Sequence, residues 1–223
     1  EGVFANAYGK PIALGPNPPK LALNRWSNDP KYAMEPETLA WVAGLTPNKI
    51  FYDIGASVGV YAVHAAVSGL WVTAFEPHQA SYDCLKDVVE RNMLGIDLVH
   101  VALSDHESSG FIGRGRSKYT FIPGWVAPGN QSVVGITLDY FVGGMMKERG
   151  YEGPHYIKLD VDGNEMQIIR GGEKTFRKAE QALIEVDPVV NPQIPGLMKD
   201  LGFSFDKKQV DACMYKEGKY KGT

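Results

Sequence analysis

Short apolar runs alternate with amphipathic segments through the middle of the chain. Residues 50–54, 71–75 and 97–103 form three apolar runs of strand length, and the first two end at a turn that contains glycine or proline. Residues 58–67 and 81–93 lie between these runs and repeat their apolar positions at helical spacing. Strands that alternate with helices predict a parallel sheet with helices on both faces.

The same alternation returns in the second half of the chain. The pattern predicts a helix over 138–149, a strand over 156–161, a helix over 165–177 and a strand over 181–186. Residues 106–135 interrupt this order, because they are rich in Gly, Ser and Pro. We expect them to form an excursion above the sheet that contains short extra strands.

The N-terminal region has a different character. Residues 1–30 are rich in Pro, Gly and Asn. Residues 15–19 predict a loop, because proline restricts its own backbone and that of the residue before it. Residues 34–45 predict a helix behind a Glu-Pro-Glu start signal. We expect residues 1–47 to form a loop and helix segment that is a candidate lid, with Trp26 and Tyr32 either in the lid or packed on the core.

Residues 48–223 then form one domain with a substrate-side insertion at about 106–135. Residues 202–206 and 211–216 predict a terminal hairpin at the edge of its sheet.

Composition narrows the function classes. The 223 residues include 23 Lys and Arg against 26 Asp and Glu, a formal charge of -3, which disfavours a protein that binds nucleic acid through its phosphates. Cys84 and Cys213 are too few and too far apart for a disulfide scaffold or a cysteine-ligated zinc site. No apolar run approaches the roughly 20 residues of a membrane span, and no signal segment opens the chain. We therefore expect a cytoplasmic protein without membrane partners, although the first residue, Glu1, leaves open that a targeting segment has been removed.

The turn after the first central strand carries the first candidate site. Its residues are Asp53, Gly55, Ala56, Ser57 and Gly59, in a DxGxxxG pattern. Ligands of open α/β sheets bind beyond the carboxyl ends of the strands, where glycine permits a close backbone approach. The second glycine of a dinucleotide fingerprint is Ser57 here, which disfavours a nicotinamide-dependent oxidoreductase. The pattern favours S-adenosylmethionine, which has no phosphate; a plain capped turn is the alternative.

Two further turns extend the cofactor site. Glu76 and Pro77 follow the second strand, where a carboxylate can accept hydrogen bonds from ribose hydroxyls or, alternatively, lie at a helix start. Ser104 and Asp105 follow the third strand and are candidates for adenine binding, with an ordinary Ser-Asp turn as the alternative. His78 has no inferable partner, so we expect a surface or satisfied core histidine.

Acidic residues crowd the end of the fourth strand. Asp160, Asp162 and Glu165 lie there with Lys158, which can offset their charge. Carboxylates close together raise one another's pKa, which suits proton transfer. The candidate catalytic residues are therefore Asp160, Asp162, Lys158 and Glu165, with Asp160 or Asp162 as the base, although an acidic helix start also explains Glu165. Asp160 is in addition a candidate for cofactor binding.

The same strand ends allow a divalent metal as a less favoured alternative. Asp160 or Asp162 with Glu185 or Asp187 would offer the oxygen ligands that magnesium or calcium prefers.

A small basic cluster lies in the insertion. Arg114, Arg116 and Trp125 are candidates for substrate binding, either of a phosphate- or carboxylate-bearing molecule or of single-stranded RNA by stacking. A solvated loop is the alternative.

In this order, the motifs resemble the FkbM-type family of S-adenosylmethionine-dependent methyltransferases over roughly residues 48–190. The resemblance rests on FYDIGASVG, AFEP, VALSD, GITLD, IKLDVDGNE, IIRGGEKTF and LIEVD. The chain departs from the usual pattern at Asp162, where Glu is common, and at Asn164, where a small residue is common.

The resemblance implies a Rossmann-like class I methyltransferase fold. Its sheet would have seven mostly parallel strands with the last antiparallel, and helices on both faces. It also implies O-methylation of a small molecule such as a sugar or polyketide. Asp53, Gly55 and Gly59 would lie at the methionine side of the cofactor, Glu76 at the ribose and Asp105 at adenine. An RNA O-methyltransferase, an oxidoreductase and a non-catalytic cofactor-binding module remain as alternatives, and the oligomeric state is not predicted.

Overall fold

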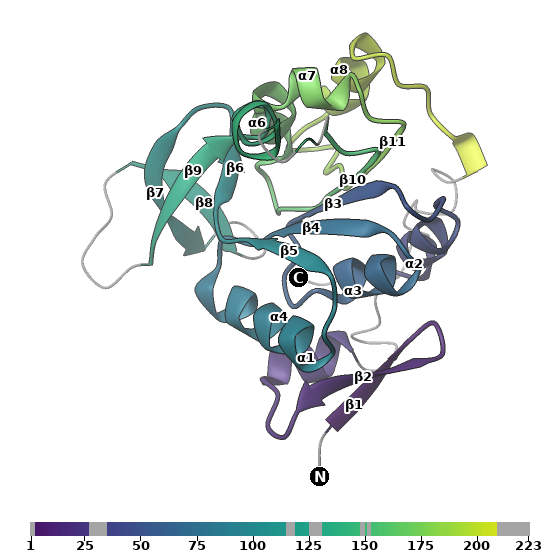
Figure 1. The fold of residues 1–223 in the computed structure, drawn as a ribbon. Coiled ribbons are helices and arrows are strands. Elements are labelled where there is room, and N and C mark those ends of the chain that lie inside the picture. The colour runs from purple at the N-terminus through teal and green to yellow at the C-terminus, as the bar shows by residue number, and fades with distance from the viewer. Residues whose placement is uncertain are drawn as a thin grey trace.

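A five-stranded parallel sheet forms the centre of the protein (Figure 1). The computed structural model describes residues 3–26, 35–114, 119–124, 131–147, 150 and 153–208. The sheet has the order β11-β10-β3-β4-β5. Its strands are β3 (Ile50–Ile54), β4 (Trp71–Phe75), β5 (Ile96–Val99), β10 (Tyr156–Leu159) and β11 (Gln181–Ile184).

The strand order places a switch point at the middle of the sheet. The chain builds outward from β3 through β4 to β5, and then returns to the other side of β3 with β10 and β11. All four pairings are parallel, so the carboxyl ends of the strands lie along one edge. Ligands of such sheets bind at this edge, outside the point where the order reverses.

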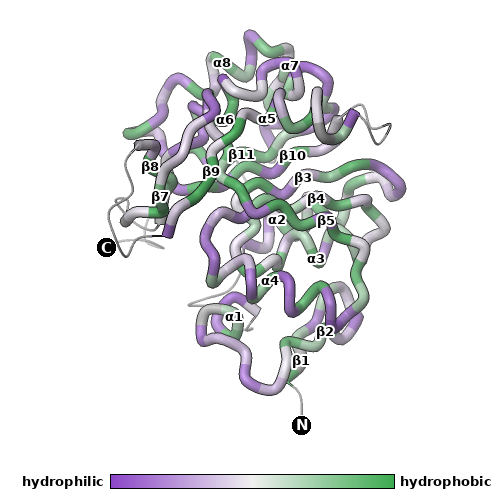
Figure 2. The backbone as a smooth tube through the Cα atoms, turned by 60° about the vertical axis from the view of Figure 1, so that its left-hand side comes forward, coloured by the Kyte–Doolittle hydropathy of each residue, from purple (hydrophilic) through white to green (hydrophobic). Residues whose placement is uncertain are grey.

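Helices cover both faces of the sheet, as the alternating pattern predicts (Figure 1). One face carries α2 (Pro36–Ala43), α3 (Val60–Val67) and α4 (Gln79–Arg91). The other carries α5 (Leu138–Tyr140), the π-helix η1 (Phe141–Met146), α6 (Glu165–Gly171), α7 (Glu173–Phe176) and α8 (Ile194–Asp200). Strand residues alternate between the two apolar clusters, with Tyr52 in one and Phe51 in the other. Figure 2 shows the apolar strands at the centre and polar residues concentrated toward the outside.

A second sheet is formed largely by the segment over 106–135, where we expect short extra strands. Its order is β6-β9-β7-β8. The strands are β6 (Ala102–Ser104), β7 (Ser108–Arg114), β8 (Tyr119–Pro123) and β9 (Ser132–Thr137). The expected strand over 97–103 is divided into β5 and β6, which belong to different sheets.

The N-terminal region has regular elements on both sides of the loop expected over 15–19. β1 (Val3–Ala7) and β2 (Lys10–Gly15) form an antiparallel hairpin, and α1 (Lys20–Arg25) follows. Tyr8 and Gly9 form its two-residue turn with φ of 47° and 85°, which suits the right-handed twist of a hairpin. Pro16, Pro18 and Pro19 lie between β2 and α1, where the loop is expected, whereas Pro11 lies within β2.

The expected seven-stranded sheet is wrong for the part of the chain that the structure describes. The central sheet has five strands, and all of its pairings are parallel. Residues 202–206 form no strand; Phe205 is 58% exposed, whereas Phe203 packs against the core. Residues 211–216 lie outside the described residues. The expected helix over 165–177 is divided at Gly172, where a Cβ would lie 3.0 Å from a Leu138 side-chain carbon.

No helix in the described ranges combines the length and apolar character needed to span a membrane.

Candidate active site

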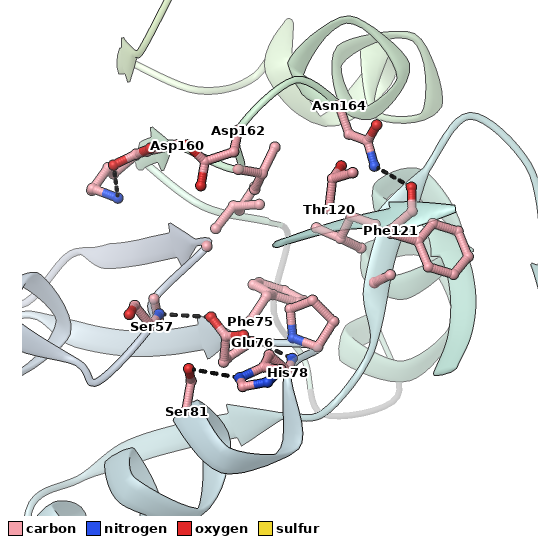
Figure 3. A pocket seen from close by; sticks show the side chains of 18 of the residues that line it. Ser57, Phe75, Glu76, His78, Ser81, Thr120, Phe121, Asp160, Asp162 and Asn164 are labelled. Atoms are coloured by element: carbon pink, nitrogen blue, oxygen red, sulfur yellow. Dashed lines mark hydrogen bonds and ion pairs between the residues drawn. The ribbon is translucent and has the colours of Figure 1, made fainter. Parts of the chain in front are cut away.

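A pocket of about 510 Å³ opens at the carboxyl ends of the central strands. Its volume lies in the range of small-molecule and cofactor sites. Figure 3 shows Ser57 and Glu76 on one side, Asp160 and Asp162 on another, and Thr120 beyond them. The pocket therefore combines the switch point of the sheet with residues of the inserted sheet.

The turn between β3 and α3 forms the first wall. The backbone N–H groups of Gly55 and Ala56 both donate to the Phe75 carbonyl at 3.0 Å, which ties the turn to the end of β4. Gly55 has φ of 81°, and a Cβ there would lie 1.9 Å from the Asp160 carbonyl oxygen. Gly59 has φ of 84°, and its Cβ would lie 2.1 Å from a methyl carbon of Leu85. Glycine is needed at both positions because the backbone is left-handed and the neighbours are close.

Glu76 places a buried carboxylate in the second wall. Its Oε2 accepts a hydrogen bond of 2.7 Å from the Ser57 N–H, and its Oε1 accepts one of 2.8 Å from the His78 N–H (Figure 3). Burial raises the pKa of the Glu76 carboxyl to about 7, although these two hydrogen bonds oppose the shift. Each oxygen retains a lone pair, so the carboxylate can still accept from a ligand hydroxyl.

Lys158 connects the base of the pocket to its rim. Asp53 and Lys158 are direct neighbours in the pairing of β3 with β10. The Lys158 ammonium lies 3.3 Å from Asp53 Oδ1 and 3.6 Å from Asp160 Oδ2, and 4.9 Å from the centre of the Tyr61 ring. Burial alone would lower the pKa of Lys158, but the two carboxylates together raise it. The ammonium therefore stays charged and balances Asp160, while Asp53 lies fully buried behind the pocket.

Three acids meet at the outer rim. One carboxylate oxygen from each of Asp160, Asp162 and Glu185 lies within 4.8 Å of the other two. Asp162 has φ of 60°, and with Asp160 it lines the pocket. This spacing is common among exposed acidic groups and does not by itself define a metal site. Asp187, the fourth expected ligand, instead accepts hydrogen bonds from the N–H groups of its own turn.

Glu165 is buried beside the turn that follows β10 and forms hydrogen bonds with it. It is 4% exposed and does not line the pocket. Its Oε1 accepts from the N–H groups of Val161 and Gly163, at 3.3 and 3.0 Å, and its Oε2 accepts from Asn191 at 3.2 Å. Glu165 therefore supports the turn that carries Asp160 and Asp162.

The expected adenine contacts lie outside the pocket. Ser104 is buried, and the Asp105 carboxylate is paired with His106 at 2.6 Å. The pocket wall nearby is apolar. It consists of Phe75, Val101, Ala102, Leu103 and Ile168.

The expected basic cluster cannot be placed at the site. Arg116 and Trp125 lie outside the described residues, and only the backbone of Arg114 is described, at the end of β7.

Several lining residues are not among the site residues that the sequence predicts. They are Arg25, Glu35, Tyr61, His78, Ile112, Thr120 and Phe121. Most of them come from α1, the start of α2 and the inserted sheet, which only the tertiary structure brings to the switch point. His78 follows Glu76-Pro77 directly, so its nearness to a candidate ribose ligand was the one available signal.

The fold and the pocket define a Rossmann-like α/β protein with a pocket at its switch point. The methyltransferase FkbM domain matches residues 53–205, well over half of the chain, so the protein belongs to the FkbM methyltransferase family. This is the family that the sequence resemblance predicts.

Two curated relatives are methyltransferases. The hexuronic acid methyltransferase AglP of Haloferax volcanii is 24% identical over 149 residues, which cover 65% of this chain and 58% of that protein. The methyltransferase sdnD of Sordaria araneosa is 22% identical over 214 residues, covering 76% of this chain and 79% of that protein. The chain therefore spans little more than half the length of AglP.

Two solved structures match the chain at low sequence identity. A SAM-dependent methyltransferase from Agrobacterium tumefaciens has a TM-score of 0.49 at 10% identity, over 90% of this chain and 58% of that chain. Precorrin-6y C5,15-methyltransferase from Geobacter metallireducens has a TM-score of 0.48 at 13% identity, over 76% of this chain and 71% of that chain.

Proposed function

We propose that the protein transfers the methyl group of S-adenosylmethionine to a hydroxyl oxygen of a small, sugar-like molecule, with Asp160 as the base. The observation that carries this proposal is one cavity that holds the Glu76 carboxylate at one side and the Asp160 and Asp162 carboxylates at another. A cofactor held by Glu76 and the glycine turn would leave the space beside Asp160 for the acceptor.

The pocket fits the cofactor in three respects. The apolar wall around Phe75 and Leu103 suits an adenine ring, and the remaining lone pairs of Glu76 suit ribose hydroxyls. The third respect concerns charge. The Ser57 N–H donates to the Glu76 carboxylate at 2.7 Å, so a pyrophosphate beside Ser57 would be repelled by that carboxylate. That arrangement favours S-adenosylmethionine over a nicotinamide dinucleotide.

The reaction requires positioning and removal of one proton. The cofactor supplies an electrophilic methyl group when bound. Asp160 accepts the proton of the acceptor hydroxyl, and the oxygen of that hydroxyl acts as the nucleophile. Lys158 partly neutralises Asp160 at 3.6 Å and holds its carboxylate in place. Glu165 keeps the 161–163 turn in shape through its two backbone hydrogen bonds.

The acceptor class rests on the relatives and the pocket charge. The name of AglP specifies a hexuronic acid as its acceptor. Carboxylate, amide and hydroxyl side chains at Asp162, Asn164 and Thr120 line the acceptor side, which suits a molecule with several hydroxyl groups. The carboxylates that line the pocket disfavour the many phosphodiester charges of RNA, so we do not propose an RNA acceptor.

Calorimetry followed by a transfer assay tests the proposal. We expect micromolar binding of S-adenosylmethionine and S-adenosylhomocysteine and no binding of NADH. Methyl transfer from labelled cofactor should then label a hydroxyl of one member of a panel of hexuronic acids and neutral hexoses. Binding of NADH alone would refute the cofactor assignment, and cofactor binding without transfer to any panel member would favour a non-catalytic module or another acceptor class.

A further inference from the structure

Acidic side chains outnumber cationic side chains among the described residues that line the pocket. The acidic lining residues are Glu35, Glu76, Asp160, Asp162 and Glu185. Lys158 is one of two cationic side chains among the described lining residues, and Asp53 and Asp160 already hold its ammonium. The other is Arg25, which has no ion pair within the described part of the chain.

The fold places Arg25 beside the cofactor turn. Arg25 is the last residue of α1, and Ala22 lies three positions earlier on the same helix face. Ala22 is fully buried against Val58 and Val60, which flank Gly59 in the turn between β3 and α3. The helix face that carries Arg25 is therefore packed against the turn that we assign to the cofactor.

Aromatic packing holds the end of this helix in place. Trp26, next to Arg25, stacks on His64 of α3 with ring centres 5.7 Å apart. Tyr8 of the hairpin packs edge-on against the same His64 ring at 4.6 Å. Arg25 is thus carried on a supported element, although it lies outside residues 53–205 that match the FkbM domain.

We infer that Arg25 forms a carboxylate-binding subsite in the pocket. A guanidinium binds a carboxylate through paired hydrogen bonds. Within the described residues, no ion pair occupies the guanidinium of Arg25. Two ligands of the proposed reaction offer this group: the amino-acid end of S-adenosylmethionine and an acidic acceptor such as a hexuronic acid. The inference rests on the proposed function, and its place beside the β3–α3 turn favours the cofactor as the source.

Binding measurements on the intact chain separate these sources. The probes are S-adenosylmethionine and its decarboxylated form, which differ only in the carboxylate. We expect Arg25→Met to weaken S-adenosylmethionine binding by about tenfold to a hundredfold and to leave decarboxylated S-adenosylmethionine within about twofold. Arg25→Lys should recover part of the loss. Lys20→Met removes the same charge from an exposed position of the same helix and should change neither affinity.

A second pair of probes tests the acceptor as the source. Glucuronate and glucose are titrated into protein saturated with S-adenosylhomocysteine. A loss of glucuronate binding in Arg25→Met, with unchanged cofactor binding, supports the subsite and assigns it to the acceptor. Unchanged binding of every probe by Arg25→Met, while the wild type binds S-adenosylmethionine, overturns the inference alone. If the wild type binds neither adenosyl probe, the proposed function fails and the inference fails with it.

Discussion

At the scale of single residues, Glu76 shows how burial and hydrogen bonding compete. The carboxyl is 7% exposed, and burial raises its pKa to about 7 against the two backbone N–H groups that favour ionisation. At a pH between the usual pKa of a glutamate carboxyl and about 7, Glu76 keeps its proton in the folded protein but has lost it in the unfolded chain. The stabilising contribution of this group is therefore complete at low pH and is lost as the pH rises through about 7.

Cofactor binding should show the opposite dependence on pH. Ribose hydroxyls donate to the ionised carboxylate, so the affinity for S-adenosylmethionine should rise about tenfold between about pH 6 and 8 as Glu76 loses its proton. Calorimetry across this range measures the effect. Glu76→Gln should bind more weakly with a flat profile, and an unchanged slope in that variant would show that another group is responsible.

Asp160 should be separable from cofactor binding. Asp160→Asn removes the proposed base but leaves the ion pair of Lys158 with Asp53 at 3.3 Å, so the fold should persist. We expect turnover with an identified acceptor to fall by about a hundredfold to ten-thousandfold, with cofactor affinity within about twofold. Asp83→Asn, at an exposed acid of α4 outside the pocket, is the matched control. Retained turnover in Asp160→Asn would remove Asp160 from the mechanism.

At the scale of elements, two turns build the site by close contact. The β3–α3 turn passes so near the end of β10 that Gly55 has no room for a side chain against the Asp160 carbonyl. The turn after β10 is held in turn by Glu165, whose carboxylate satisfies two of its N–H groups. The close contact between Gly55 and the Asp160 backbone therefore positions both the β3–α3 turn and the proposed base.

A pair of glycine variants tests this contact. Gly55 and Gly69 have similar φ, 81° and 87°, but a Cβ at Gly69 would find its nearest neighbour at 3.4 Å and not at 1.9 Å. Both alanine variants carry the cost of a left-handed backbone, about 1 kcal/mol. Gly55→Ala should lose about 1–3 kcal/mol more of the free energy of unfolding from overpacking. Urea unfolding measures the difference, and equal losses would contradict the contact.

At the scale of the whole molecule, the N-terminal hairpin is part of the core. Ile12 and Leu14 of β2 belong to the same apolar cluster as Phe51 and Val72 of the central sheet. The hairpin also carries Tyr8 to the His64 ring beside α1. We therefore expect this region and the sheet to unfold together, not as a lid that separates from the domain.

Leucine truncation in the N-terminal region checks this expectation. Leu14 is 4% exposed, so Leu14→Ala should lower the free energy of unfolding by about 2–5 kcal/mol. Leu23 is 41% exposed, so Leu23→Ala should change it by less than about 1 kcal/mol. Both variants should unfold in one transition by fluorescence and circular dichroism. A separate early transition in Leu14→Ala would show that the hairpin is an independent unit.

Local patterns were sufficient for much of the central architecture. The strands at 50–54 and 71–75 match β3 and β4 because parallel strands buried on both faces are continuously apolar. The glycine turn, Glu76 and Asp160 were also predictable, since each follows a strand end directly. Asp105 also follows a strand end directly, and Glu165 begins the helix after β10, yet both lie outside the pocket. The path of the chain after a strand is not encoded by its end.

The sequence by itself determined the fold class, the family and the side of the sheet that carries the site. These follow from short-range periodicity and from motifs within a few residues of one strand end. Only the tertiary structure decided which side chains share the pocket. Arg25, Tyr61 and Thr120 reach it through helix packing and a second sheet, and Glu165 turns away into hydrogen bonds with its own turn. Such contacts join residues far apart in the chain, and their geometry depends on packing that no local pattern records.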